Sequence, residues 1–247
     1  MTSRTQHETD SDGAPAEAFR YGDRRRFLQA GAAGLAALLA RLPRAAAEDG
    51  AAPAASPRVI KLVAFGDSLT AGIRLPAGVS FPILLEMALR REGYHVAIVN
   101  AGVSGDTSTG GLARLDWSLG AGADGLILEL GANDMLRGTN PKITKAALDG
   151  ILARLKEKNI KVLIAGMLAS PSLGRDYRAE FDAIYPDLAA RYDALLYPFF
   201  LEGAAGHPEL NLPDGLHPNA AGVEAIVANI LPSVRALLAS LGDKPGG

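Results

Sequence analysis

Ser68 and His217 are the residues of this 247-residue chain whose types and settings best fit nucleophilic catalysis. Ser68 lies in Phe65-Gly-Asp-Ser-Leu-Thr-Ala-Gly72, directly after an apolar run over residues 59–65, so it is predicted in a turn that follows a buried strand. A serine hydroxyl is a poor nucleophile at neutral pH and needs a hydrogen-bonded base. Asp214-Gly-Leu-His217 supplies an imidazole and a carboxylate that could orient it. Together these residue types indicate acyl transfer through a serine nucleophile.

Other interpretations of these residues stay open in the sequence. Serine is a common N-cap residue, so Ser68 could simply begin a helix. Asp214 and His217 could likewise cap a helix that starts near Pro218. His207, in a polar loop, is a second candidate base. The segment around Ser68 lacks the Gly-x-Ser-x-Gly elbow of the α/β-hydrolases, which disfavours that family.

An acyl-transfer site also needs hydrogen-bond donors that point at the developing oxyanion. Asn133, in Gly131-Ala-Asn-Asp134, carries a side-chain amide that could donate. Gly105 has no side chain, so its backbone N–H could approach a substrate closely. The backbone N–H of Ser68 is a third candidate donor. Gly-Asp and Gly-x-Asn-Asp are also common turn sequences, so each motif alone is weak evidence.

Composition and charge disfavour several classes of function. The net charge is −2, and no basic segment large enough to hold nucleic acid is present in the predicted domain. The chain has no cysteine and no His-x-His or His-Glu-x-x-His spacing, so no metal site is predicted. No phosphate-binding glycine loop is found, and no cofactor is expected. Three further aspartates are predicted to tie loops through backbone hydrogen bonds: Asp67, Asp106 and Asp134.

Short apolar runs alternate with helical patterns along residues 58–243. The expected strands are 59–65, 96–99, 125–130, 161–165 and 194–197. The expected helices are 81–91, 111–119, 141–158, 175–192 and 218–241. Runs without strict alternation are typical of strands buried on both faces of a parallel sheet. The order therefore predicts one α/β domain over residues 58–243, with a five-stranded parallel sheet and helices on both of its faces.

The polar segments of the chain follow the predicted strands directly. These segments are 66–70, 100–109, 131–138 and 213–219. Ligands of open α/β sheets bind outside the carboxyl ends of the strands. We therefore expect Ser68, Gly105, Asn133 and His217 to meet at one edge of the sheet.

The first 57 residues have a different composition. Residues 1–47 contain Arg24-Arg25-Arg26 before Phe-Leu, a short apolar run over 30–40 and Ala45-Ala46-Ala47, which predicts an export signal of the twin-arginine type. The apolar run is too short for a permanent membrane anchor, and a disordered cytoplasmic extension is the other alternative. We expect cleavage after Ala47, a flexible linker over 48–57, the export machinery as a partner, and a periplasmic or secreted location.

The motifs together resemble those of the SGNH (GDSL) hydrolase superfamily. Gly-Asp-Ser-Leu at Ser68, the loop glycine Gly105, Gly-x-Asn-Asp at Asn133 and Asp-x-x-His at His217 occur in the family's order. Further segments are similar to the bacterial periplasmic thioesterase, lysophospholipase and arylesterase branch, among them Asn100-Ala-Gly-Val-Ser-Gly-Asp-Thr-Ser108 and Phe181-Asp-Ala-Ile-Tyr-Pro186. The similarity extends over essentially all of residues 58–243.

The resemblance implies a fold, a set of roles and a class of substrate. It implies a three-layer flavodoxin-like fold without a cofactor. Ser68 would be the nucleophile, His217 the general base and then acid, and Asp214 its orienting partner. The oxyanion hole would consist of the Ser68 and Gly105 backbone N–H groups and the Asn133 side chain. The substrates would be acyl esters or thioesters, with broad specificity and medium acyl chains.

The acyl chain is expected to lie against apolar residues that follow the later strands. These residues are Met167, Leu168, Leu173, Phe199, Leu210 and Leu212. Two alternatives are a carbohydrate O-deacetylase of the same superfamily and a protein that binds lipids without turning them over. The second alternative is disfavoured because Ser68, Asp214 and His217 are all present.

Overall fold

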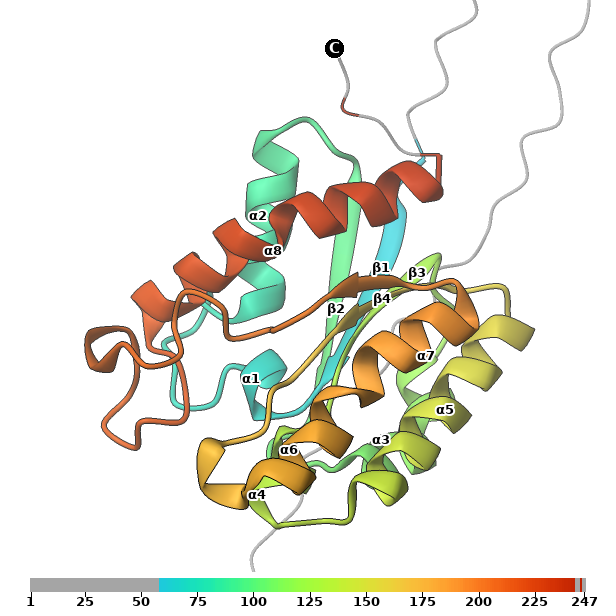
Figure 1. Ribbon diagram of the computed structural model, residues 1–247. Helices are drawn as coiled ribbons and strands as arrows, with labels where there is room; N and C mark the ends of the chain where they lie inside the picture. The colour runs from blue at the N-terminus through green and yellow to red at the C-terminus, as the bar shows by residue number, and fades with distance from the viewer. Residues whose placement is uncertain (1–57, 243–244, 246–247) are drawn as a thin grey trace, which may run out of the picture. The chain divides into compact units, whose positions relative to one another are not determined.

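Five parallel strands form one sheet in the order β2-β1-β3-β4-β5 in the computed structural model, which describes residues 58–242 and 245 (Figure 1). The strands are β1 (Ile60–Gly66), β2 (Val96–Gly102), β3 (Gly125–Glu129), β4 (Lys161–Ala165) and β5 (Leu195–Tyr197). Every residue of β3 is buried, as expected for a strand covered on both faces. This strand order is the flavodoxin-like one, so the predicted sheet is confirmed.

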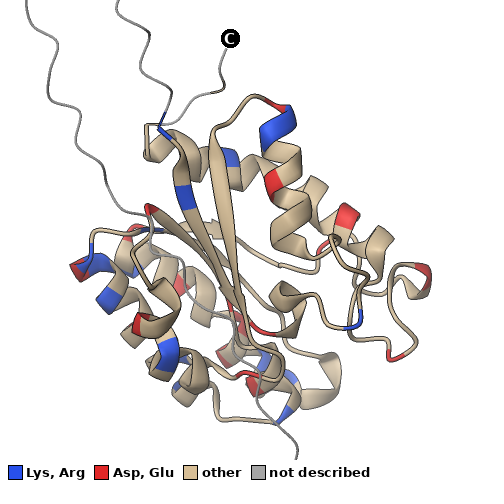
Figure 2. Cartoon of the chain, turned by 180° about the vertical axis from the view of Figure 1, so that it is seen from behind, with Lys and Arg blue, Asp and Glu red and all other residues tan. Residues whose placement is uncertain are grey.

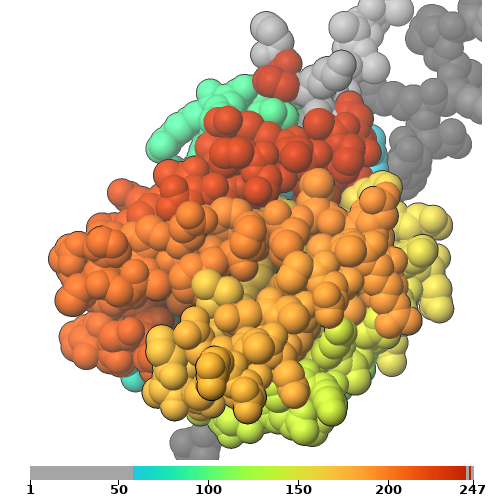
Figure 3. Space-filling view, viewed as in Figure 1, coloured from blue at the N-terminus to red at the C-terminus, as the bar shows by residue number. Residues whose placement is uncertain are grey.

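Helices cover both faces of the sheet (Figure 1). On one face lie α2 (Phe81–Arg91) and α8 (Ala220–Ser240), which contact each other. On the other face lie α3 (Ser108–Leu119), α5 (Pro141–Glu157) and α7 (Ile184–Tyr192), with α6 (Arg175–Asp182) beside α5. Helices and loops hide most of the sheet in the space-filling view (Figure 3). The three-layer α/β class predicted from the sequence is therefore confirmed.

The core extends from the sheet to the loop that follows β5. Phe81 on α2 packs edge-to-face on Phe200, which follows β5 in the sequence, with 4.9 Å between ring centroids. Both side chains are about 99% buried, and burial of such a ring contributes about 1.5–3 kcal/mol. This contact fixes the start of the long segment that leads from β5 to α8.

Helix α8 is long and apolar enough to cross a membrane by length and composition, with a mean hydropathy of 1.4. Its apolar side chains are nevertheless used in the core. Val223, Ile226, Ile230 and Val234 are at most 2% exposed and pack on the sheet side of the helix. Packing in the core of the domain is therefore sufficient to explain the apolar composition of α8.

Charged side chains of both signs are interspersed on the helices (Figure 2). Arg154 on α5 and Lys158, which follows α5 directly, both pair with Asp116 on α3, and Lys145 on α5 pairs with Asp187 on α7. Exposed pairs of this kind contribute about 0–1 kcal/mol each. The described surface therefore shows mixed charge rather than a field of one sign.

Several element boundaries differ from the sequence-based expectation. The helix expected over 175–192 is two helices that meet at Ala183. Pro186 explains the break, because it cannot donate a hydrogen bond to the carbonyl of Asp182 and its ring would clash there. Two short helices were not expected, α1 (Ser68–Ala71) and α4 (Ala132–Leu136). The export signal and linker predicted over residues 1–57, and the predicted domain end at 243, lie outside the described residues.

Candidate active site

Ser68 is the first residue of the short helix α1, immediately after β1. Asp67 is the N-cap residue, and its side chain accepts a hydrogen bond from the backbone N–H of Leu69. Gly72 ends the helix in the left-handed conformation, with φ of 80°. This strand-turn-helix geometry places Ser68 at the carboxyl edge of the sheet, and its side chain is held close to the body of the domain.

His217 meets Ser68 across 149 positions of the sequence. The distance between Ser68 Oγ and His217 Nε2 is 2.9 Å, and that between His217 Nδ1 and Asp214 Oδ2 is also 2.9 Å. Asp214 Oδ1 accepts hydrogen bonds from the backbone N–H groups of Leu216 and His217, both at 3.0 Å. The three side chains thus form a continuous hydrogen-bonded chain from hydroxyl to carboxylate.

The Asp214 carboxylate is held in its ionised form. The backbone N–H of Leu216, the His217 ring and the backbone N–H of His217 lower the pKa of Asp214 well below its usual value. Arg74, in the segment that follows α1, also donates to Asp214 Oδ2 at 3.1 Å. An ionised carboxylate can fix the ring orientation of His217 and stabilise its cationic form. The contact with Arg74 was not predicted, because a lone arginine in a loop carries no sequence signal.

The loop that carries Asp214 and His217 is a short hairpin. Asn211 and Pro218 form an antiparallel bridge, and the backbone N–H of Leu212 donates to the carbonyl of His217 at 2.7 Å. The side chain of Asn219 then caps α8 by accepting from the backbone N–H of Gly222. Asp214 and His217 are therefore positioned by the same closed loop.

A small, mainly apolar cavity of about 100 Å³ lies beside Ser68. Besides Ser68 and His217, its lining residues are Asp67, Leu69, Ala132, Asn133, Met135, Leu136, Met167, Leu201 and Leu216. Leu136 and Leu216 are 53% and 49% exposed, so apolar surface continues outward from the cavity. The cavity can hold a few apolar atoms next to the serine hydroxyl.

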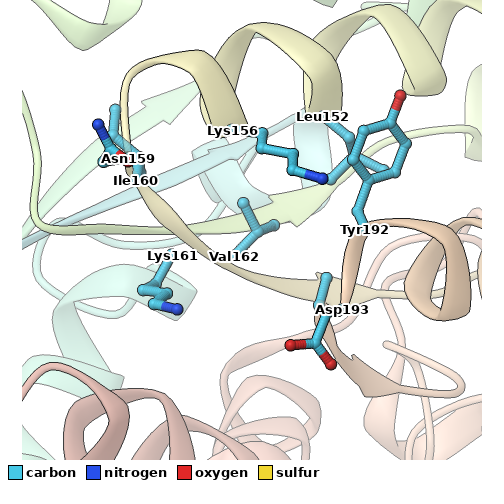
Figure 4. A pocket seen from close by; sticks show the side chains of 9 residues that line it. Leu152, Lys156, Asn159, Ile160, Lys161, Val162, Tyr192 and Asp193 are labelled. Carbon is cyan, nitrogen blue, oxygen red and sulfur yellow. The ribbon is translucent and has the colours of Figure 1, made fainter.

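A larger hollow of about 350 Å³ lies at the start of β4 and just before β5 (Figure 4). Lys156, Lys161, Tyr192 and Asp193 are among its lining residues. It is at the amino ends of these strands, opposite the edge where ligands of open α/β sheets bind. Neither Ser68 nor His217 lines it, so the cavity beside Ser68 is the better candidate for an active site.

Comparison with known proteins assigns the chain to a family. Residues 64–225 match the model of the GDSL-like Lipase/Acylhydrolase family. An arylesterase from Vibrio mimicus is 42% identical over 166 residues, which are 67% of this chain and 83% of that protein. The esterase TesA of Pseudomonas aeruginosa is 37% identical over 178 residues, 72% of this chain and 89% of that protein.

The chain belongs to the GDSL-like lipase/acylhydrolase family. The crystal structure of AlinE4, an SGNH-hydrolase family esterase, has 46% sequence identity and a TM-score of 0.63. The match covers 74% of this chain and 98% of the AlinE4 chain. The superfamily resemblance inferred from the motifs is therefore confirmed.

Asn133 and Gly105, two of the predicted oxyanion donors of this GDSL-like chain, lie in different settings. Asn133 lines the cavity beside Ser68, and its side-chain amide donates to Asp67 Oδ2 at 2.9 Å. Gly105 has a φ of 81°, which an L side chain rarely adopts, so the backbone conformation itself favours glycine at this position. Its carbonyl accepts from Arg137, and it is not among the residues that line the cavity. The backbone donor role of Gly105 therefore remains a prediction.

Only one of the six apolar residues predicted to contact the acyl chain lines the cavity beside Ser68. That residue is Met167. Leu173, Phe199 and Leu210 are partly buried against the core without lining this cavity, Leu168 is 43% exposed outside it, and Leu212 lines a separate hollow with Pro208 and Pro213. The apolar residues that line this cavity are Ala132, Met135, Leu136, Leu201 and Leu216, together with Leu69 and Met167. Contact of the other five predicted residues with an acyl chain remains a prediction.

Of the three aspartates expected to tie loops through backbone bonds, Asp106 behaves differently. It pairs with the Arg114 side chain at 2.6 Å, so that expectation is wrong for Asp106. Asp134 does accept from the backbone N–H of Ser108 at 2.8 Å, and also from its hydroxyl. Asp67 accepts from the backbone N–H of Leu69 and from Asn133, so it contacts the candidate site directly.

Glu129, the last residue of β3, is a buried carboxyl group that sequence reasoning missed. Its side chain is 0% exposed, and its Oε2 accepts from the Thr70 hydroxyl at 2.8 Å and from the backbone N–H of Asp67 at 3.3 Å. Burial, and then the nearby Asp67 carboxylate, raise the pKa of Glu129 well above its usual value. A carboxylate at the end of an otherwise apolar strand, two residues before Gly131, was the signal that could have revealed it.

The raised pKa of Glu129 predicts a pH-dependent gain of stability for Glu129→Gln. A group with a raised folded-state pKa stabilises the fold at low pH, and this contribution is lost as the pH rises through that pKa. Because the pKa of Glu129 is raised in the fold, the folded chain holds this proton to a higher pH than the unfolded chain does. Glutamine keeps an oxygen for Thr70 and Asp67 without this cost. We expect the unfolding midpoint of Glu129→Gln at pH 8 to rise by at least about 2–4 °C, the shift that 1 kcal/mol produces in a domain of this size.

Thermal unfolding followed by circular dichroism at pH 5 and pH 8 measures this effect. The increase in the unfolding midpoint should be smaller at pH 5, where a fraction of the unfolded wild-type chains also carry the proton on Glu129. Glu180→Gln, at an exposed position on α6, is the matched control and should shift neither midpoint. An increase of equal size at both pH values would contradict a raised pKa of Glu129 in the folded protein.

Proposed function

We propose that the protein is a serine ester hydrolase that acts through an acyl-enzyme on Ser68. The observation that carries the proposal is the unbroken chain of hydrogen bonds from Ser68 through His217 to Asp214 beside an apolar cavity. Esterase and arylesterase relatives with 37–42% identity support the same reaction class.

The reaction has two steps that use the same three side chains. Ser68 Oγ attacks the acyl carbonyl, and His217 Nε2 takes the hydroxyl proton and passes it to the leaving alkoxide or thiolate. A water molecule then attacks the acyl-enzyme, and its proton returns through His217 to Ser68. Asp214 stays ionised and stabilises the cationic ring between these transfers. In both steps the Ser68 and Gly105 backbone N–H groups and the Asn133 amide would stabilise the negative oxygen.

The dimensions of the cavity support acyl esters and thioesters of short to medium chain length as substrates. A volume of about 100 Å³ accommodates only the first few atoms of an acyl chain. The exposed side chains of Leu136 and Leu216 then offer apolar surface to the following atoms. An acetyl group alone would leave this surface unused, which favours an acyl esterase over the carbohydrate O-deacetylase alternative.

The proposal is tested with purified protein and p-nitrophenyl esters of two to sixteen carbons. We expect hydrolysis with a maximum at intermediate chain lengths, and stoichiometric inactivation by a p-nitrophenyl phosphonate that labels the peptide containing Ser68. Turnover of the acetyl ester alone would favour the deacetylase. Ester binding without hydrolysis or labelling would favour the lipid-binding alternative and refute the proposal.

We also propose that residues 1–47 direct export to the periplasm or the exterior through the twin-arginine machinery. The support is the order of three arginines, a short apolar run and three alanines in the sequence. N-terminal sequencing of the protein from a periplasmic fraction should begin at Glu48. A mature chain that still contains Arg24 would contradict this proposal without affecting the proposed reaction.

A further inference from the structure

A single buried carboxylate connects the nucleophile helix to the candidate oxyanion donor. Asp67 is 0% exposed, and each of its two oxygens accepts a different hydrogen bond. Oδ1 accepts from the backbone N–H of Leu69 at 2.9 Å, and Oδ2 accepts from Asn133 Nδ2 at 2.9 Å. The first contact holds the turn that carries Ser68, and the second holds the amide that lines the cavity.

We propose that Asp67 is a positioning residue that orients the Asn133 side-chain amide, so that an N–H group rather than the carbonyl oxygen faces the reacting acyl group. An asparagine amide has a donor end and an acceptor end of nearly the same shape, so packing alone barely distinguishes its two orientations. An ionised carboxylate only accepts hydrogen bonds. It therefore bonds to the NH₂ group and is repelled by the carbonyl oxygen of the flipped amide. The inference rests on the proposed function, in which Asn133 stabilises the oxyanion.

The side chain at residue 67 must offer two acceptor atoms that point in different directions. A serine, threonine or asparagine at residue 67 could still cap α1 by accepting from Leu69. An asparagine that used its oxygen for Leu69 would present its NH₂ group to Asn133. The backbone N–H of Leu69 cannot turn, whereas the Asn133 amide can. Asn133 would therefore flip and direct its carbonyl oxygen toward the developing negative charge.

The backbone of Asp67 is itself held from the neighbouring strand. Gly66 and Glu129 are register partners in β1 and β3, and Glu129 Oε2 accepts from the backbone N–H of Asp67 at 3.3 Å. A Cβ atom at Gly66 would lie 2.4 Å from Glu129 Oε2, so only glycine allows this approach. The Asp67 carboxylate thus has little freedom to move away from Asn133.

The electrostatic setting leaves Asp67 ionised under the usual assay conditions. Burial raises the pKa of Asp67 to about 6, while hydrogen bonds from Leu69 and Asn133 oppose that rise. The charge of His217 also lowers the pKa of Asp67, and that of Asp106 raises it. Glu129 on β3 faces Asp67, and burial raises the pKa of Glu129 well above its usual value. At pH 8 the carboxylate is therefore an obligate acceptor.

The substitution Asp67→Asn tests the proposal with an almost isosteric side chain. With p-nitrophenyl butyrate at pH 8, we expect kcat to fall by about 10²–10³-fold, the loss produced when one oxyanion donor is removed. KM should change by less than about threefold, because the ground-state ester has little negative charge on its oxygen. The unfolding midpoint should stay equal or rise, because burial disfavours the charged side chain. Asp149→Asn is the control. Asp149 accepts a hydrogen bond from the Tyr192 hydroxyl and does not line the cavity beside Ser68, so this variant should keep the wild-type kcat.

A double-mutant cycle separates positioning from a general structural role. Asn133→Ala alone should also lower kcat by about 10²–10³-fold. If Asp67 acts through Asn133, Asp67→Asn in the Asn133→Ala background should lower kcat by less than about threefold further. A kcat of Asp67→Asn within threefold of wild type, or losses that multiply in the double variant, would overturn the proposal. The proposed function would still stand if the wild-type protein hydrolyses the ester and Ser68→Ala does not.

A second readout does not depend on the folding of a variant at residue 67. In ¹⁵N spectra of the wild-type protein, the Asn133 side-chain amide can be assigned by its absence from Asn133→Ala. We expect one of its two protons to shift downfield and exchange slowly with solvent, because it is bonded to a buried carboxylate. Two rapidly exchanging protons at positions typical of exposed asparagines would overturn the proposal.

Discussion

Ser68→Ala is expected to lower kcat for p-nitrophenyl butyrate by about 10⁴-fold or more, with little change in stability. The substitution removes the atom that forms the acyl-enzyme, so the two-step route is closed. Uncatalysed attack by water in the same cavity would be the remaining reaction. The hydroxyl binds His217 at the edge of the sheet, whereas the cap of α1 is provided by Asp67, so the fold should persist.

Steady-state kinetics and thermal unfolding of the same preparation check this result. Ser172→Ala, an exposed serine in the short 3₁₀ helix Pro171–Leu173, is the matched control and should keep wild-type turnover. Retention of more than about a hundredth of wild-type kcat by Ser68→Ala would exclude Ser68 as the nucleophile.

His217→Ala is expected to cause a loss of similar size, again about 10⁴-fold or more in kcat. Without the ring, no base lies 2.9 Å from Ser68 Oγ to take its proton, and no acid is available for the leaving group. The vacated space should admit free imidazole, which can act from the same position. We therefore expect imidazole in the buffer to restore part of the turnover of His217→Ala but none of that of Ser68→Ala.

His207→Ala is the control for this substitution. His207 was the second candidate base from the sequence, and in the structure it is exposed and bonded to Glu209. Its replacement should leave kcat within about twofold of wild type. The opposite pattern, a large loss for His207→Ala and a small one for His217→Ala, would reassign the base.

Topology explains why the contact between Ser68 and His217 could be predicted. Each of these residues follows a strand of a parallel sheet, and the carboxyl ends of such strands meet at one edge whatever their separation in sequence. The register of β1 with β3 similarly brings Asn133 near Ser68, because Gly66 pairs with Glu129 just before both loops. The parallel sheet follows from the alternation of apolar and helical segments, whereas the strand order was implied only by the family resemblance.

The walls of the cavity could not be predicted in the same way. Leu173 and Leu210 follow strands and contact the core as Met167 does, but of these three Met167 alone also lines the cavity. Leu136 lies in α4, which is too short to show a helical period, and Leu216 lies between Asp214 and His217 in a loop. Which apolar residues of a loop face a ligand depends on side-chain directions that no local pattern encodes.

The role of the buried carboxyls was also beyond the local pattern. Asp67 was expected to tie a loop through a backbone hydrogen bond, and one of its oxygens does accept from the backbone N–H of Leu69. Its second oxygen meets Asn133, which is 66 positions away, and Glu129 joins it from another strand. The motif shows that an aspartate precedes the nucleophile in the sequence. Only the folded structure shows which groups this aspartate holds in place.

The hairpin closed between Asn211 and Pro218 carries both Asp214 and His217. A displacement of the whole hairpin would change the distance from His217 to Ser68 Oγ while the hydrogen bond between Asp214 and His217 stays intact. Ser68, by contrast, is held at the end of β1 by the cap of α1. Substitutions that shift this hairpin as a whole are therefore expected to alter the reach of the imidazole toward the hydroxyl without separating the imidazole from its carboxylate.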